Sequence, residues 1–209
     1  EADRMLDMGF LDDVEKIIRE CPKQRQTFLF SATISPDITR LAKRYMKDPV
    51  EVAVDNQVDP TKLEQVFYDA GYEKFSLLVY LLREEKSKLV MVFTNTKHNA
   101  DFIAHNLKNQ GINAVPLHGN LAQNKRSRVL EEFHRSEKFV LVCTDVAARG
   151  LDIKNVSHVY NYDSPKNSND YIHRIGRTAR AGKEGKAITL LGDQDYENFR
   201  KVQQNPDLR

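Results

Sequence analysis

The sequence is short of cysteine, of long apolar runs and of net charge of either sign, and each shortage excludes a class of protein. Cys21 and Cys143 are its two cysteines, and neither has a metal-ligating partner at close spacing. We therefore expect free thiols in a reducing compartment, the cytoplasm. No apolar run approaches the roughly 18 residues that a membrane span needs. Because no basic-then-apolar leader is present either, we expect neither a membrane protein nor a secreted one.

Glycine-rich phosphate loops are also missing. Neither the dinucleotide-binding pattern G-x-G-x-x-G nor a complete P-loop occurs. The nearest match runs from Gly182 to Ala187, has too short a spacing and lacks the Ser or Thr that would hold magnesium. Any nucleotide chemistry would therefore need a phosphate cradle supplied from outside this chain.

The charges are distributed unevenly, although the formal net charge of the 209 residues is only +2. Residues 1–57 hold 9 Lys and Arg against 11 Asp and Glu, whereas residues 58–209 hold 23 against 19. The downstream part is therefore the better candidate for contact with a polyanion.

Short apolar runs alternate with amphipathic stretches along the chain. The apolar runs predict strands at Thr27–Phe30, Leu89–Phe93, Asn113–Leu117, Phe139–Cys143, Ser157–Tyr160 and Ala187–Leu191. Helical spacing predicts helices at Glu73–Glu84, Thr96–Asn109, Gln123–Arg135, Ser168–Ala181 and Asp193–Gln204. Continuously apolar strands are typical of a parallel sheet covered by helices on both faces, so we expect an α/β doubly wound fold with right-handed crossovers.

One polar segment with a proline, residues 56–61, interrupts this alternation and follows the strand-like run Val50–Val54. We interpret it as a linker. The first 57 residues then hold two helices and two strands, including Thr27–Phe30, which is too little for a sheet core. We expect this piece to be the end of a preceding domain, and residues 58–209 to form a second domain.

Three arginines recur at three-residue intervals in the stretch Tyr171–Arg180, namely Arg174, Arg177 and Arg180, with His173 beside them. Residues three apart share a helix face, so the three guanidinium groups would lie close together. Such a group suits a phosphate clamp, because arginine presents a planar fork of donors to phosphate oxygens. A solvated basic helix face is the alternative.

Polar residues also follow several predicted strands, at the edge where open parallel sheets bind ligands. Thr144 and Asp145 follow Phe139–Cys143; Gly150 then permits close backbone approach, and Asp152 is suited to accept hydrogen bonds from ribose hydroxyls or simply to form a turn or cap.

Two further stretches follow strands in the same way. Leu117–Gln123 opens a helix that carries Lys125, Arg126 and Arg128, which suits a phosphodiester or is an ordinary helix start with surface cations. Thr96, after Leu89–Phe93, is a weaker candidate and has a helix cap as its alternative role.

Taken together, these stretches resemble the motifs of the DEAD-box family of superfamily 2 helicases over nearly the whole chain. Glu1-Ala2-Asp3 looks like the DEAD motif without its first Asp, and Ser31-Ala32-Thr33 resembles motif III. Phe93–Thr96 resembles motif IV, Gln123 with Arg126 the Q-x-x-R element, Thr144–Asp152 motif V and His173–Arg180 motif VI. Ala179 stands where the family usually has Gly, a change that favours helix and should be tolerated.

The resemblance implies a RecA-like second domain from an ATP-dependent RNA helicase that locally separates RNA duplexes. Its expected partners are RNA and an upstream RecA-like domain. That domain would make most of the contacts to ATP and Mg²⁺, so the chain alone should lack ATPase activity. By the same resemblance the residue roles are catalysis at Glu1, Arg177 and Arg180; ribose binding at Gly150 and Asp152; interdomain coupling at Asp3, Ser31, Thr33 and His173; and RNA-backbone contact at Thr96, Gly119, Gln123, Arg126 and Thr144. A superfamily 2 DNA helicase or translocase and a non-catalytic RNA-binding module are the alternatives.

Overall fold

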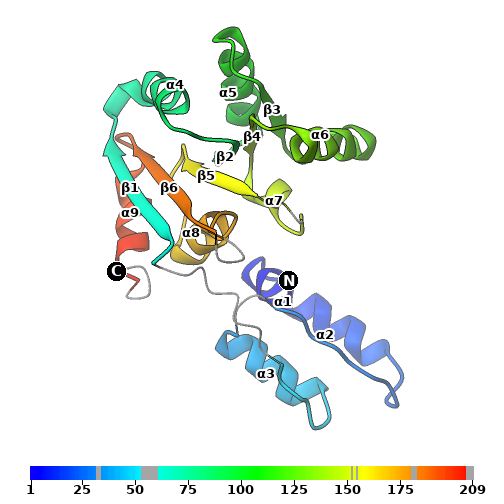
Figure 1. The fold of residues 1–209 in the computed structure, drawn as a ribbon. Coiled ribbons are helices and arrows are strands. Elements are labelled where there is room, and N and C mark those ends of the chain that lie inside the picture. The colour runs from blue at the N-terminus through cyan, green and yellow to red at the C-terminus, as the bar shows by residue number, and fades with distance from the viewer. Residues whose placement is uncertain (32–33, 53–60, 152, 154, 180–182, 206–209) are drawn as a thin grey trace. The chain divides into compact units, whose positions relative to one another are not determined.

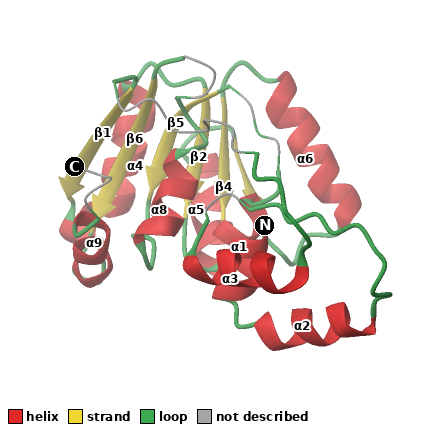
Figure 2. Ribbon diagram, turned by 90° about the horizontal axis from the view of Figure 1, so that it is seen from below, coloured by secondary structure: helices red, strands yellow, loops and turns green. Residues whose placement is uncertain are grey.

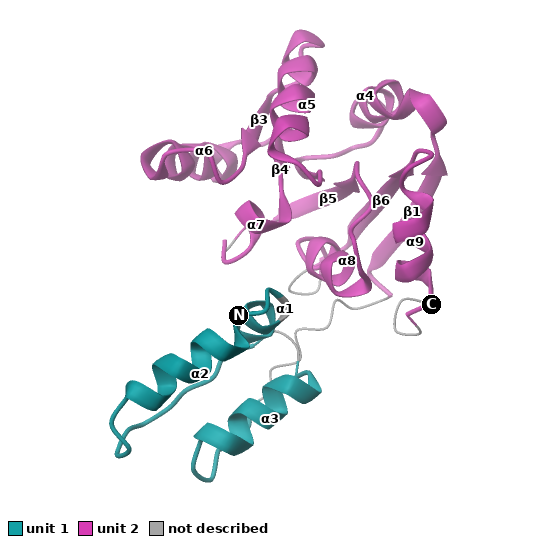
Figure 3. Ribbon diagram, turned by 180° about the vertical axis from the view of Figure 1, so that it is seen from behind, with its two compact units in different colours: residues 1–55 teal, residues 56–209 magenta. Residues whose placement is uncertain are grey.

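The computed structural model describes residues 1–31, 34–52, 61–151, 153, 155–179 and 183–205. The chain divides into two compact units, residues 1–55 and residues 56–209, which Figure 3 shows in different colours. None of the described helices is long and apolar enough to cross a membrane.

The described part of the first unit contains the helices α1 (Ala2–Asp7), α2 (Leu11–Glu20) and α3 (Pro36–Tyr45). Helix α3 begins at an N-cap, because the Ser35 hydroxyl accepts a hydrogen bond from the Ile38 amide at 3.3 Å and Pro36 follows at the first helical position. Ile38 and Leu41 are the buried apolar side chains among this unit's described residues. Such a core is far smaller than an independent domain needs.

The strand predicted at Thr27–Phe30 does not form, and this prediction is wrong. Phe28 and Phe30 are 69% and 75% exposed. A strand needs a neighbour for its backbone hydrogen bonds, and the described residues of this unit contain no other strand. In the run Val50–Val54, residues 50–52 form no strand either, and residues 53 and 54 lie outside the described residues.

The second unit is built on a six-stranded parallel sheet with the strand order β1-β6-β5-β2-β4-β3 (Figure 1). Its strands are β1 (Leu63–Asp69), β2 (Leu89–Phe93), β3 (Ala114–Leu117), β4 (Phe139–Cys143), β5 (Val156–Asn161) and β6 (Gly185–Leu191). Every residue of β2 and β4 is buried, as expected for central strands covered on both faces. The predicted α/β class and doubly wound parallel sheet are confirmed.

Helices cover both faces of the sheet (Figure 2). They are α4 (Lys74–Glu84), α5 (Lys97–Asn109), α6 (Gln123–Arg135), α7 (Asp145–Ala148), α8 (Ser168–Ile175) and α9 (Tyr196–Gln203), with the 3₁₀ helix η1 (Gly71–Glu73) before α4. On one face, α4 and α5 bury Leu78 and Leu107 completely. On the other, Phe133 of α6 meets Phe139 of β4 edge to face at 5.7 Å. Burying each such side chain stabilises the fold by about 1.5–3 kcal/mol.

Two elements of the second unit differ from the expected ones. No continuous apolar run marks β1, because it is an edge strand in which exposed side chains outnumber buried ones. Helix α8 ends at Ile175, whereas helical spacing predicts a helix to Ala181. The Thr178 hydroxyl donates to the Val156 carbonyl at 2.7 Å, and this contact holds the chain against β5 instead of allowing another helical turn.

Candidate functional site

The segments that follow β2, β3, β4 and β5 meet at one edge of the sheet, because all four strands are parallel. We call these segments, residues 94–96, 118–120, 144–145 and 162–164, the carboxyl edge. Backbone hydrogen bonds join them: the Thr94 amide donates to the Cys143 carbonyl at 3.0 Å, and the Tyr162 amide to the Phe93 carbonyl at 3.0 Å. The carboxyl edge is therefore one connected surface, at the place where open parallel sheets bind ligands.

Thr96 is the N-cap of α5, which is the alternative role given to this residue from the sequence. Its hydroxyl oxygen accepts a hydrogen bond from the Asn99 amide at 3.1 Å, and the residue is exposed. A hydroxyl can accept and donate at once. The Thr96 proton is therefore still available to a ligand oxygen, so the capping role and a binding role are compatible.

Gly119 lies in an exposed turn after β3 that His118 and Lys97 hold in place. The His118 ring is 2.9 Å from Asp101 through Nε2 and accepts from the Asn120 amide at 3.4 Å through Nδ1. The Lys97 ammonium donates to the Asn120 side chain at 2.8 Å. A polar turn with an adjacent cation is suited to a phosphate oxygen.

Gln123 and Arg126 occupy the first turn of α6 beside that turn. Gln123 is exposed, and Arg126 is partly buried. One guanidinium nitrogen of Arg126 donates to the Ala147 carbonyl of α7 at 2.9 Å, and this hydrogen bond ties the side chain to the helix that follows Thr144. The other donors of this guanidinium bond to none of the residues that the structure describes, and remain for an anion.

Thr144 and Gly150 flank α7. Thr144 is only 7% exposed, and its backbone carbonyl accepts from the Ala147 and Ala148 amides at 3.0 Å each. Gly150 has a φ of 70°, the left-handed region that favours glycine, and is exposed, which permits close backbone approach. Asp152, the expected ribose ligand, lies outside the described residues.

Arg174 is not part of a phosphate clamp, and this prediction is corrected. Its side chain is 1% exposed and pairs with Asp145, through Nε to Oδ1 at 2.7 Å and through Nη2 to Oδ2 at 2.8 Å. The two residues are 29 positions apart in the sequence, so the local pattern around Arg174 could not predict its acidic partner. A buried arginine with a bidentate carboxylate is fully occupied within the protein.

Arg177 follows the end of α8 and therefore does not share a helix face with Arg174. One of its terminal nitrogens donates to the Leu151 carbonyl at 2.8 Å, beside the segment expected to hold the ribose. His173 is partly buried on α8. Arg180 lies outside the described residues.

Asp3 and Ser31 lie together in the first unit. The Asp3 amide donates to the Ser31 hydroxyl at 3.2 Å, and Asp3 is 7% exposed. Glu1, the expected catalytic carboxylate, is exposed at the N-cap of α1. Thr33 lies outside the described residues.

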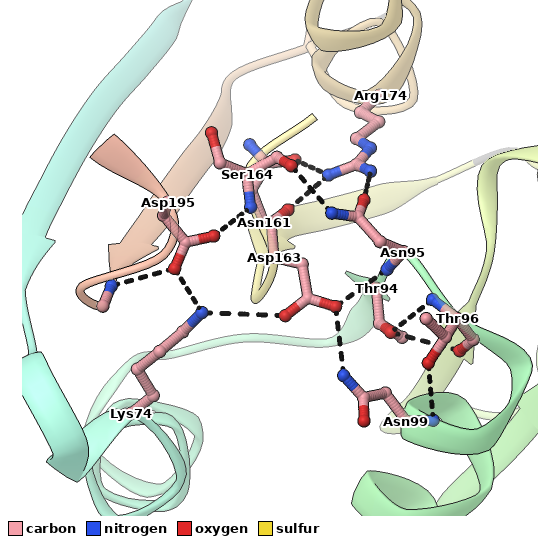
Figure 4. Close-up of polar contacts among 11 residues, drawn as sticks. Lys74, Thr94, Asn95, Thr96, Asn99, Asn161, Asp163, Ser164, Arg174 and Asp195 are labelled. Carbon is pink, nitrogen blue, oxygen red and sulfur yellow. Dashed lines mark hydrogen bonds and ion pairs between the residues drawn. The ribbon is translucent and has the colours of Figure 1, made fainter. Parts of the chain in front are cut away.

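Sequence analysis did not predict the polar network that includes the carboxyl-edge residues Asn95 and Asp163, which Figure 4 shows in close-up. Arg174 donates to the Asn95 side chain at 3.0 Å and to the Asp163 carbonyl at 2.6 Å, and Lys74 reaches Asp195 at 2.8 Å. Asn95 and Asp163 each lie two residues after the end of a strand, β2 and β5, so polar residues after buried strands were an available signal. Lys74 and Asp195 had none, because only the folded sheet brings them together.

Electrostatics leave this part of the molecule without a reactive thiol. Burial raises the pKa of the Cys143 thiol, and the neighbouring Asp145 carboxylate raises it further. Cys143 therefore packs as a small apolar side chain. Among the residues that the structure describes, no group of three or more His, Cys, Asp or Glu side chains is placed to hold a metal ion.

Comparison with known proteins places this geometry in a family. Residues 73–182 match the family model described as the helicase conserved C-terminal domain, and residues 1–41 match the DEAD/DEAH box helicase model. The chain is 43% identical over 211 residues to the ATP-dependent RNA helicase CshA of Limosilactobacillus reuteri, covering 100% of this chain and 42% of that protein. It is 43% identical over 205 residues to the probable ATP-dependent RNA helicase DDX47 of Homo sapiens, covering 97% of this chain and 45% of that one.

A solved structure gives the same result. The chain matches S. cerevisiae Dbp5 bound to RNA and ADP BeF3 with a TM-score of 0.82 and 34% identity, covering 98% of this chain and 55% of that one. The chain spans less than half the length of the two helicases compared above. With a RecA-like parallel sheet and matches to both helicase models, the chain belongs to the DEAD-box family of superfamily 2 helicases and corresponds to its C-terminal portion.

Proposed function

We propose that this chain is the RNA-contacting half of an ATP-dependent RNA helicase, which couples ATP binding and hydrolysis to local separation of RNA duplexes. The observation that carries the proposal is the carboxyl edge, where Thr96, Gly119 and Thr144 follow three adjacent parallel strands and Arg126 is hydrogen-bonded to the helix that follows Thr144. The similarity to Dbp5, which was solved with RNA and ADP BeF3, supports it.

The RNA contacts would be made to the sugar–phosphate backbone. The candidate groups are a hydroxyl, a glycine backbone, an amide side chain and a guanidinium, all of which suit phosphate and sugar oxygens. Backbone contacts of this kind position a strand and carry no sequence information. We assign Gln123 to the same kind of backbone contact. We therefore expect the affinity for RNA to fall as the salt concentration rises and to vary little with base sequence.

The ATP contacts would be shared with a partner domain. Residues 1–57 would end the first RecA-like domain and residues 58–209 would form the second. Gly150 and Asp152 would hold the ribose, and Arg177 and Arg180 would stabilise the charge that develops on the transferred phosphoryl group. Mg²⁺ and the phosphate cradle would come from the first domain, because the described residues offer no carboxylate cluster for a metal.

Coupling between ATP and RNA would use the polar residues of the first unit together with α8. Glu1 would orient the attacking water, while Asp3, Ser31, Thr33 and His173 would transmit the state of the nucleotide to domain closure. The hydrogen bond between the Asp3 amide and the Ser31 hydroxyl supports a connection between these two residues. Both cysteines are free thiols, which is consistent with the cytoplasm as the compartment.

The test is ATP turnover and duplex separation by the full-length parent, with RNA and DNA loading strands compared. We expect RNA to stimulate turnover and DNA to stimulate it weakly. Equal stimulation by DNA would favour a DNA helicase or translocase, and no stimulation by either would favour a non-catalytic RNA-binding module. The purified 209-residue chain should show negligible turnover, and robust turnover would refute the assignment of a shared ATP site.

A second experiment separates catalysis from stability at Arg177 and Arg180. In the parent, Arg180→Ala should lower kcat by about 1,000-fold or more, the scale measured for arginine fingers, with little change in melting temperature. Arg180→Lys should rescue poorly, because an ammonium lacks the guanidinium fork. Near-normal turnover in both Arg177→Ala and Arg180→Ala would rule out the finger role.

A further inference from the structure

Lys74 lies outside every motif that the sequence singles out, yet its partly buried side chain lies between two carboxylates. It begins α4, and its side chain is 14% exposed. Its ammonium lies 2.8 Å from Asp195 and 3.7 Å from Asp163 (Figure 4). It also lies 4.7 Å from the centre of the Tyr162 ring. Lys74 is therefore the cation that compensates two acids which would otherwise repel each other at low dielectric.

Each of these acids holds a turn of the backbone. Asp195 accepts from the Ser164 amide at 2.7 Å and from the Gly192 amide at 2.9 Å. Asp163 accepts from the Asn95 amide at 2.8 Å, in the turn that leads to Thr96 and α5. Both carboxylates accept from these amides and pair with the Lys74 ammonium at the same time. The positions of the turns after β2 and β5 thus depend on the charge of Lys74.

The same network continues to the segment after β4. The Asn95 side chain accepts from Arg174 at 3.0 Å and donates to the Ser164 carbonyl at 3.0 Å. Arg174 in turn holds both carboxylate oxygens of Asp145, which directly follows Thr144. Ion pairs and hydrogen bonds therefore connect Lys74 with Asn95 and Asp145, which are the sequence neighbours of Thr96 and Thr144.

We propose that Lys74 is a positioning residue for RNA binding, and that it acts through Asp163 and Asp195 to set the distance between the Thr96 turn and the Thr144 segment. The proposal rests on the proposed function, because it assigns RNA contact to those two threonines. Lys74 itself touches no substrate. Without its ammonium, one acid loses compensation, the Asp163–Asn95 contact loosens and the Thr96 turn moves relative to Thr144.

The first test uses the 209-residue chain and requires no RNA. In Lys74→Met, the amide signals of Asn95 and Ser164 and the Nε–H signal of Arg174 should shift and exchange faster with solvent in NMR spectra. Lys201→Met is the matched control, because Lys201 makes an exposed pair with Glu197 on α9 and should leave these signals unchanged. Unchanged Asn95 and Arg174 signals in folded Lys74→Met would overturn the positioning role.

The second test measures RNA dependence in the full-length parent. Lys74→Met should raise the RNA concentration for half-maximal ATP turnover by about tenfold, which corresponds to a loss of about 1.4 kcal/mol in RNA binding as the Thr96 and Thr144 contacts no longer fit one strand together. The kcat at saturating RNA should stay within about twofold, because bound RNA restores the geometry. If Lys74 only stabilised the fold, Lys74→Met would lower the melting temperature without raising the RNA concentration for half-maximal turnover.

Val202→Ala controls for stability in that test, because Val202 is buried on α9 in a separate cluster with Leu63 and Ile175. It should lower the melting temperature and leave the RNA dependence unchanged. An equal rise in half-saturation for Val202→Ala would overturn the proposal. A parent without any RNA-stimulated turnover would count against the proposed function instead, while the NMR signals still decide whether Lys74 holds the turns.

Discussion

Arg174 and Arg177 have the same chemistry and lie three positions apart, but their surroundings separate their roles. Arg174 is buried against Asp145, Asn95 and the Asp163 carbonyl, whereas Arg177 lies past the end of α8 and bonds the Leu151 carbonyl. Sequence spacing predicted an arginine cluster but not this division, because the partners of Arg174 come from three other segments. Residue type is readable from sequence; which arginine is left for a ligand depends on tertiary contacts.

Replacing Arg174 should therefore affect stability before it affects ligand binding. Arg174→Ala leaves Asp145 uncompensated in a largely buried site, so we expect a loss of about 3–5 kcal/mol in the free energy of unfolding. Arg200→Ala, at an exposed position of α9, should cost less than about 0.5 kcal/mol. Chemical denaturation of the 209-residue chain measures both. A loss of less than about 1 kcal/mol for Arg174→Ala would contradict the buried network.

His158 makes the stability depend on pH in a defined direction. Burial lowers the pKa of His158, and Lys186 adds to the effect, while Glu85 opposes it. The unfolded chain therefore takes up this proton first, and the free energy of unfolding should fall as the pH drops from about 7 to about 5. His158→Gln should flatten that part of the stability curve. An unchanged slope in the variant would show that His158 does not titrate differently in the two states.

Elements were predictable in proportion to how completely they are buried. The central strands β2 and β4 match their predicted bounds residue for residue, and so does α6. The edge strand β1 lacks a continuous apolar run, and the predicted strand at Thr27–Phe30 lacks a neighbour. The local pattern of apolar residues indicates which elements are buried. It does not predict correctly whether a strand forms when that depends on a pairing partner elsewhere in the chain.

The early end of α8 puts Ala179 into a conformation that alanine does not favour. Its φ is 52°, in the left-handed region, so the expectation that alanine would favour helix here is wrong. This conformation costs an L-residue about 1–2 kcal/mol, and glycine almost nothing. Ala179→Gly should therefore raise the free energy of unfolding by about 0.5 kcal/mol or more, because the strain relieved exceeds the gain in unfolded-chain entropy.

Chemical denaturation of Ala179→Gly and of the unsubstituted 209-residue chain measures this difference in the free energy of unfolding. Ala148→Gly is the control, because Ala148 is a buried helical alanine and should lose stability by about 1 kcal/mol or more on the same substitution. Destabilisation of both variants to the same extent would mean that Ala179 is not strained.

At the scale of the whole molecule, the two units differ in how much apolar surface they bury. The second unit has two large clusters, one on each face of its sheet. The first leaves large apolar side chains exposed, including Phe28, Phe30 and Ile17. Exposed apolar surface on this scale marks a face that another part of a protein covers. The sequence predicted this difference from the small number of elements before residue 57.

Residues 56–209 should therefore fold without the first unit. We expect limited proteolysis of the 209-residue chain to remove the first unit first, and the remaining piece to unfold cooperatively at nearly the same denaturant midpoint. Circular dichroism during denaturation measures both chains. A midpoint lowered by more than about 1 M urea would show that the first unit stabilises the sheet.

The central claim is that the carboxyl edge binds the RNA backbone, and an NMR titration of the labelled 209-residue chain with short single-stranded RNA tests it most directly. We expect the signals of Thr96, Gly119, Gln123 and Thr144 to shift alike for two RNAs of different base sequence. Arg126→Ala should weaken both RNAs equally and lower the salt slope by about 1, whereas Arg135→Ala, at the far end of α6, should not. Shifts confined to another surface, or an Arg126→Ala effect that depends strongly on base sequence, would contradict the account.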